Sequence, residues 1–99
     1  MVGTTEKGFS GGKLVVTSGV SDRMSEDPDF YRMVNNSISR HFRCDWGDLS
    51  AEDKAENDLA VKEGDLRILS AYEHQTLPKI WIITEADRSS TAVLFPDEY

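Results

Sequence analysis

Residues 45–58 read Asp45-Trp46-Gly47-Asp48-Leu49-Ser50-Ala51-Glu52-Asp53-Lys54-Ala55-Glu56-Asn57-Asp58. They combine an aromatic residue, a glycine turn, a helix start and the densest run of carboxylates in the chain. Ser50 followed by Asp53 imitates a capping box, and carboxylates in a first turn suit the positive end of a helix. The stretch therefore predicts a Trp-containing loop and then a helix that runs from Ser50 to a stop at Gly64.

This helix offers little to a core. On a helical wheel Ala51, Ala55 and Leu59 form a thin apolar strip, and acidic residues flank it. We expect the helix to bury few side chains and to present most of its surface to solvent.

A longer helix precedes the stretch. Asp27 and Pro28 make a good helix start, because the carboxylate accepts from free N–H groups and proline at the first position loses no bond. One side of this helix is mainly apolar and aromatic, with Phe30, Tyr31, Met33, Val34, Ile38, His41 and Phe42. The opposite side carries Arg32, Asn36, Arg40 and Arg43. We expect a core-facing helix with an arginine-bearing outer face, ending near Arg43.

Four short apolar runs predict strands at residues 13–17, 66–72, 80–84 and 91–95. Residues 18–19 read as a turn, and residues 21–26 are ambiguous, with at most one helical turn. The linkers at residues 74–78 and 85–90 are short enough for antiparallel hairpins. The predicted fold is α+β, with two helices packed on a three- to four-stranded, largely antiparallel sheet in the order β-α-α-β-β-β. We expect a flexible arm at residues 1–12 and a single domain at residues 13–99.

The run at residues 80–84 is apolar on both faces of a strand. Ile80 and Ile82 face one way, and Trp81 and Ile83 face the other. Helices would cover one face, and a second copy of the chain is one candidate cover for the other.

Charge divides the chain into two unlike parts. The formal net charge is −7, made of +1 for residues 1–43 and −8 for residues 44–99. An acidic half of this kind repels phosphates and argues against nucleic-acid binding through that half. The single cysteine, Cys44, excludes an internal disulfide and fits a reducing compartment. With no apolar run long enough to span a membrane, we expect a cytoplasmic protein without a membrane partner.

The carboxylates could present a row of negative charge to a basic groove, or they could form a solvated face that keeps the protein soluble. Trp46 could be an exposed hot spot, but a structural plug is the favoured interpretation. We predict that a protein partner contacts the following residues: Asp45, Trp46, Asp48, Glu52, Asp53, Glu56 and Glu63. The rival interaction feature is the arginine set Arg32, Arg40 and Arg43, which could touch phosphates or pair with the acidic helix.

Catalytic and metal sites have weaker support. His41 and Cys44 are three residues apart, but two ligands without a second pair make a weak metal signal. Glu85 and Asp87 could form an acid–base pair, although a simple turn closed by Asp87, with Arg88 paired locally, is favoured. We therefore predict no metal, no cofactor and no enzyme activity.

The chain also contains two longer sequence motifs. They are the Asp45–Asp48 motif with Glu52-Asp53-Lys54 and Asn57, and the run from Lys79 to Ser89 with the ending Val93 to Tyr99. On them the chain resembles small proteins of bacterial mobile elements and plasmids, many labelled "plasmid-related protein" and some "type I restriction subunit". The resemblance spans residues 13–99 and transfers no catalytic residue. At position 44 it implies a small residue such as glycine in place of Cys44.

The resemblance implies a genetic context in which anti-restriction and anti-CRISPR proteins are common. The leading hypothesis is a non-enzymatic acidic inhibitor of a nucleic-acid-handling host defence complex. The alternative is a small nucleic-acid-binding regulator that uses the arginine face, and a homodimer is compatible with either.

Overall fold

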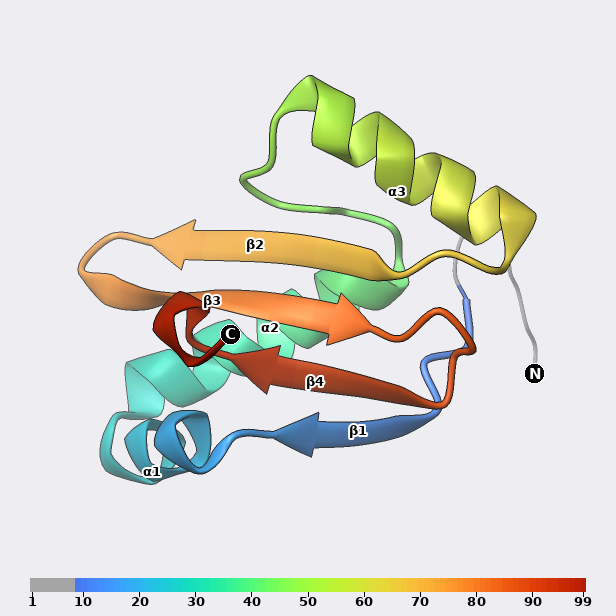
Figure 1. The fold of residues 1–99 in the computed structure, drawn as a ribbon. Coiled ribbons are helices and arrows are strands. Elements are labelled where there is room, and N and C mark those ends of the chain that lie inside the picture. Colours follow the sequence, from blue (N-terminus) through green and yellow to red (C-terminus); the bar gives the residue numbers. More distant parts are fainter. Residues whose placement is uncertain (1–8) are drawn as a thin grey trace, which may run out of the picture.

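The computed structural model describes residues 9–99, so most of the predicted N-terminal arm lies outside the described residues. The elements are β1 (Lys13–Val16), α1 (Ser18–Glu26), α2 (Pro28–Phe42), α3 (Ala51–Glu63), β2 (Ile68–His74), β3 (Leu77–Thr84), β4 (Ser90–Leu94) and a 3₁₀ turn, η1 (Pro96–Glu98). The strands form one sheet in the order β1-β4-β3-β2 (Figure 1). The predicted α+β class is confirmed. Within residues 9–99, no helix has the length and apolarity that a bilayer crossing requires.

Two features of the topology differ from the prediction. The residues expected to turn and then form at most one helical turn instead form the nine-residue helix α1, whose start is capped by the Thr17 hydroxyl. The sheet is mixed, because β1 pairs in parallel with β4 while the other two pairs are antiparallel. The chain therefore crosses over from β1 through three helices and returns to pair beside it with its last strand.

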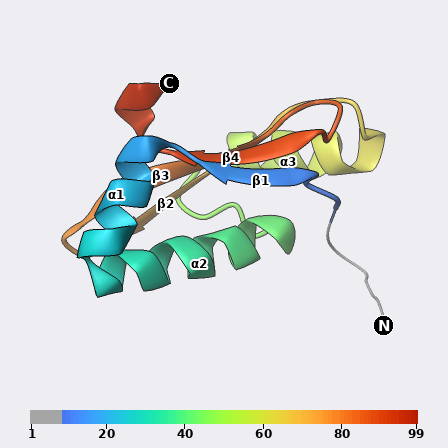
Figure 2. The same ribbon diagram turned by 90° about the horizontal axis from the view of Figure 1, so that it is seen from below.

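One face of the sheet carries the core. Helices α1 and α2 lie against this face, and Figure 2 shows them on the same side of the strands. The buried cluster consists of Val20, Phe30, Met33, Val34, Tyr72, Ile80, Ile82 and Val93. Asp27 caps α2 as predicted, with its carboxylate accepting from the N–H groups of Asp29 and Phe30. The prediction for Tyr31 is wrong, because its side chain is 51% exposed. It lies at the margin of the apolar stripe, where the sheet does not reach.

The opposite face of the sheet has little cover among the described residues. Val15, Ala92, Ile83 and Leu69 follow one another across the four strands in register. The C-terminal end folds over part of this face, where Tyr99 packs edge-on against Trp81 with ring centroids 5.7 Å apart. The edge-on view in Figure 2 shows α1 and α2 on the other side of the strands, while the short 3₁₀ turn η1 stands on this face.

The stretch that starts at Asp45 closes one edge of the sheet. β2 is the edge strand, and its outward N–H and C=O groups would be open to pairing with another chain. The Asp48 N–H donates to the Ala71 carbonyl at 2.7 Å, and the Ala71 N–H donates to the Trp46 carbonyl at 3.4 Å. The Asp48 carboxylate then accepts from the Glu73 N–H at 2.8 Å. Residues 46–48 thus act as a short parallel strand along the middle of β2.

Asn57 completes this edge from α3. Its side-chain amide donates to the Leu69 carbonyl at 2.7 Å and accepts from the Leu69 N–H at 3.3 Å. The amide therefore replaces a neighbouring strand at that position. Helix α3 lies beyond β2 at the rim of the sheet (Figure 1).

The apolar strip of α3 does not face the rest of the fold. Ala51, Ala55 and Leu59 are exposed, while Asn57 and Ala60 are buried. The hydrogen bonds of Asn57 set the rotation of the helix, and an apolar count cannot anticipate a buried amide. The prediction that α3 buries little is confirmed, as are its Ser50 cap and its left-handed stop at Gly64.

A chain of buried polar groups crosses the core. The Thr91 hydroxyl donates to the Gly11 carbonyl at 2.9 Å, so it must accept from Thr84, 2.7 Å away. Thr84 has then used its only proton and accepts from His41 Nε2 at 2.9 Å. His41 Nδ1 is left as the acceptor of the Ser70 hydroxyl. The Gly11 carbonyl can only accept, so it sets the direction of every hydrogen bond in this chain. It thereby fixes the neutral tautomer of His41 that carries its proton on Nε2.

Burial also favours the neutral imidazole of His41, the form that this hydrogen-bond network requires. His41 has no exposed surface, and burial lowers its pKa from 6.5 to about 4. Phe9, Phe42 and Trp46 pack around the ring, with centroids 5.3, 5.4 and 5.6 Å away. The imidazole is therefore a neutral structural element.

The edge contact at Gly47 gives a first prediction. Gly47 and Gly64 both have positive φ, 74° and 82°, so alanine at either adds backbone strain of about 1–2 kcal/mol. At Gly47 the new Cβ would also lie 2.1 Å from the Ala71 carbonyl oxygen, whereas at Gly64 it meets nothing within 4 Å. We expect Gly47→Ala to lower the free energy of unfolding by about 2–4 kcal/mol more than Gly64→Ala. Equal urea midpoints for the two variants would contradict the edge contact.

The buried imidazole gives a second prediction. The pKa of His41 is lower in the fold than in the unfolded chain, so its contribution is complete above pH 6.5 and is lost as the pH falls through about 4. The loss approaches about 3 kcal/mol, from roughly 1.4 kcal/mol per pKa unit. Urea unfolding at a series of pH values would measure it. The control is His41→Gln, which cannot titrate. A parallel decline in both proteins would assign the acid sensitivity to carboxylates instead.

Candidate functional site

Helix α3 and the edge strand enclose a groove with an apolar floor and an acidic rim. Leu49 and Leu69 lie half-buried in it, and Leu59 and Leu66 are 49% and 46% exposed. Asp53 and Glu56 of α3, together with Asn57 and Arg67, complete the lining of a space of about 530 Å³. We call this surface the leucine groove. Large exposed leucines gathered in one concavity are typical of binding surfaces.

The predicted acidic residues divide between this groove and the outer surface. Asp53 and Glu56 line the groove, whereas Glu52 and Glu63 are exposed on α3 outside it. None of the four forms an ion pair with a described residue. These carboxylates therefore stay available to a cationic partner.

The loop residues of the predicted site have structural partners. Trp46 is only 3% exposed, and its indole N–H donates to the Asp58 carboxylate at 2.9 Å. The prediction that Trp46 contacts a partner is thus corrected: the indole plugs the space between α2, α3 and β2, as the favoured interpretation had it. Asp48 holds the β2 edge, and Asp45 pairs with Arg40 at 2.8 Å. That pairing lowers the pKa of Asp45, and both carboxylates serve the fold.

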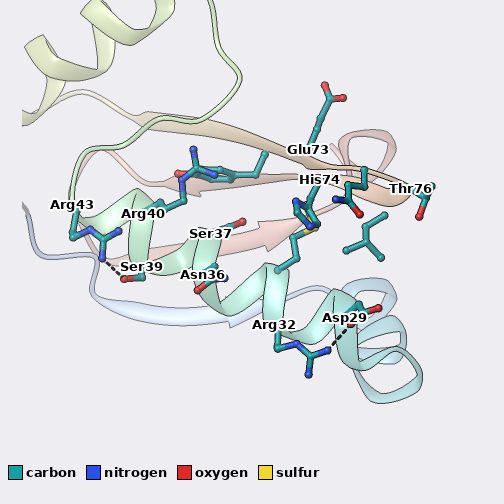
Figure 3. A pocket seen from close by; sticks show the side chains of 14 residues that line it. Asp29, Arg32, Asn36, Ser37, Ser39, Arg40, Arg43, Glu73, His74 and Thr76 are labelled. Atoms are coloured by element: carbon teal, nitrogen blue, oxygen red, sulfur yellow. Dashed lines mark hydrogen bonds and ion pairs between the residues drawn. The ribbon is translucent and has the colours of Figure 1, made fainter.

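A second groove lies between the outer face of α2 and the turn that joins β2 to β3 (Figure 3). We call it the α2–hairpin groove, and it encloses about 600 Å³. Arg32, Arg40 and Arg43 line its helix side, and His74 and Thr76 line its turn side. The sequence grouped the arginines correctly, because they lie on one helix face. It did not indicate that the hairpin turn would build a wall opposite them.

Carboxylates compensate most of this positive charge. Arg32 pairs with Asp29, and Arg40 pairs with Asp45 while its guanidinium also stacks 4.9 Å from the centre of the Tyr72 ring. Arg43 donates to the Ser39 hydroxyl at 3.0 Å. The α2–hairpin groove is therefore polar, but it is not a concentrated anion site.

His41 and Cys44 do not form a metal or nucleophile pair. Both ring nitrogens of His41 are used by Ser70 and Thr84, and no group of three metal-ligating side chains exists among residues 9–99. Cys44 has φ of 67°, a left-handed conformation that favours glycine. A glycine would adopt this backbone without strain.

The turn at residues 85–90 is structural, as predicted, and Arg88 reaches further than expected. The Asp87 carboxylate accepts from the Ser89 N–H, which closes the turn. Hydrogen bonding from the Ser89 hydroxyl, and then from its N–H, lowers the pKa of Asp87. The Arg88 guanidinium donates to the carbonyls of Ala60 and Leu66 at 2.9 and 2.7 Å. It thereby fastens the C-terminal end of α3 to the sheet.

The leucines are the site residues that the sequence did not reveal. Leu59 was assigned to the thin apolar strip of α3, and Leu49, Leu66 and Leu69 belong to three different segments. Only the turn of α3 about Asn57 brings them together, so no local pattern could have found them.

Comparisons with protein-family models, with curated proteins and with solved structures gave no match for this chain.

Proposed function

We propose that this chain is a non-enzymatic binding protein whose binding site is the leucine groove with its acidic rim. The observation that carries the proposal is the pairing of exposed Leu59 and Leu66 with unpaired Asp53 and Glu56 in one concavity. Apolar contacts supply affinity, and the carboxylates select a basic partner and speed its approach.

The preferred partner is a basic protein surface of a nucleic-acid-handling complex. Residues 45–65 carry eight acidic residues and two lysines, a net charge of −6, and most of these lie on or beside α3. A basic channel built for phosphates would attract this helix. Together with the resemblance to mobile-element proteins, this supports inhibition of a host defence complex, of the anti-restriction or anti-CRISPR kind.

The α2–hairpin groove supports the alternative of a nucleic-acid-binding regulator. In its favour, three arginines line a groove large enough for a backbone segment. Against it, Asp29 and Asp45 already neutralise two of the three. A phosphate would have to displace these carboxylates, so the acidic groove is the better-supported site.

The third prediction tests the leucine groove. We expect the protein to protect infecting phage in hosts that carry defined restriction or CRISPR systems, and to bind the purified effector of the sensitive system. Leu59→Asp and the double change Asp53→Lys/Glu56→Lys should weaken that binding at least about tenfold, or roughly 1.4 kcal/mol. Isothermal calorimetry at two salt concentrations would measure affinity and charge dependence.

The matched control is Glu63→Lys, which reverses a charge on the same helix outside the groove. It should bind within about threefold of the parent protein, since a single exposed charge outside the groove contributes little. Equal losses of affinity in all variants would show that binding depends on net charge and not on the leucine groove. Binding that survives the groove variants but fails in Arg43→Glu would transfer the site to the α2–hairpin groove.

A further inference from the structure

The two edges of the sheet are treated differently. The β2 edge is closed by residues 46–48 and by Asn57. The β1 edge, at the other side of the sheet, has no described element beside it (Figure 1). Open edges of natural sheets are usually blunted by short strands, charged side chains, proline or bulges. Strand β1 is short and carries Lys13, yet it exposes Leu14 and Val15, at 47% and 40%.

The backbone of β1 offers a defined set of unpaired groups. On the β4 side, the N–H of Lys13 donates to the carbonyl of Ser89, just before β4, and the N–H of Thr17 donates to the Val93 carbonyl. Because strand residues alternate, the N–H and C=O groups of Leu14 and Val16 point away from β4. Each copy therefore presents two donors and two acceptors along this edge.

We propose that two copies of this chain pair through their β1 edges, antiparallel about a two-fold axis at Val15. In this register Leu14 of one copy faces Val16 of the other, and four hydrogen bonds satisfy all the outward groups. A two-fold contact requires a self-complementary surface, and the central position of these outward groups meets that requirement. The product is a continuous eight-stranded sheet.

Charge complementarity favours a second copy of this chain as the partner of the β1 edge. The register sets Lys13 opposite Thr17 of the other copy, on the sheet face that α2 does not cover. There the Thr17 hydroxyl donates to the Glu98 carboxylate at 2.7 Å. Each Lys13 ammonium therefore comes within reach of the other copy's Glu98, which gives two symmetric ion pairs. The acidic helices α3 lie beyond the opposite edges of the sheets, so the repulsion between them is small.

The uncovered face also becomes continuous across the axis. In each copy Val15 stands in register with Ala92, and Ala92 stands in register with Ile83. Pairing at β1 brings the two Val15 side chains together as a non-hydrogen-bonded pair, whose side chains are close neighbours. Two apolar rows merge into one. The contact is short, so we expect a weak and readily reversible dimer.

Sedimentation velocity over a wide concentration range tests the pairing. The chain should shift reversibly from its monomer mass of 11.1 kDa towards twice that mass. Leu14→Pro removes an outward N–H without touching the bonds to β4, and it should weaken dimerisation at least tenfold. A monomer at every concentration, or a dimer that Leu14→Pro leaves intact, would overturn the proposal.

Cross-linking tests the register independently. In a Cys44→Ser background, Val15→Cys should form a disulfide-linked dimer in oxidised glutathione, because the two positions meet at the axis. Leu14→Cys should cross-link at least tenfold more slowly, because it faces Val16. Equal rates would overturn the register. Circular dichroism checks that each variant folds, and Leu14→Lys replaces Leu14→Pro if the proline variant does not.

Discussion

The closed β2 edge is the constraint on which the other features depend. A four-stranded sheet ends in two rows of unpaired peptide groups, and here one row is satisfied by chain segments that are not strands. Residues 46–48 supply backbone groups and Asn57 supplies a side-chain amide. Their alignment with β2 fixes where α2 must end, where the Trp46 plug sits and how α3 is rotated. The rotation in turn exposes Leu59 beside Asp53 and Glu56.

The same constraint gives the acidic helix an unusual position. A helix normally buries an apolar stripe against a sheet face. Helix α3 instead stands at the rim, fixed by Asn57, by Ala60 and by the Arg88 guanidinium at its C-terminal end. Most of its surface is therefore free for charge, and the carboxylates cost the fold little. A charged helix held outside the core is well suited to present a binding surface.

Local signals in the sequence predicted the elements well. Asp27, Ser50 and Gly64 were identified as caps because capping chemistry involves only neighbouring residues. Helix α1 was missed because Gly19 and a polar composition conceal its cap at Thr17. The parallel pairing of β1 with β4 depends on the path of the whole chain, so no local pattern contains it. That helices cover only one face of the sheet was anticipated from Trp81 and Ile83, because alternation within one strand is enough to indicate a second apolar face.

The candidate site was predicted less completely, for a physical reason. Carboxylates could be recognised individually, but their surroundings could not, so Asp45 and Asp48 were grouped with Asp53 although they hold the fold. A helical wheel gives relative angles and no absolute orientation. The wheel therefore grouped Leu59 with Ala51 and Ala55, and it did not identify Asn57 as the buried position. A buried amide that mimics a strand is visible only once its partner backbone is in place.

Because few contacts attach α3 to the sheet, this helix affects how the protein begins to unfold and aggregate. Helices with few buried contacts open locally at lower free energy than the rest of a domain. If α3 swings away, the Leu69 peptide groups lose their partner while the sheet remains folded. An unsatisfied strand beside exposed leucines is a template for intermolecular β-pairing. Opening of this one rim helix is therefore enough to expose an aggregation-prone edge, without unfolding of the core.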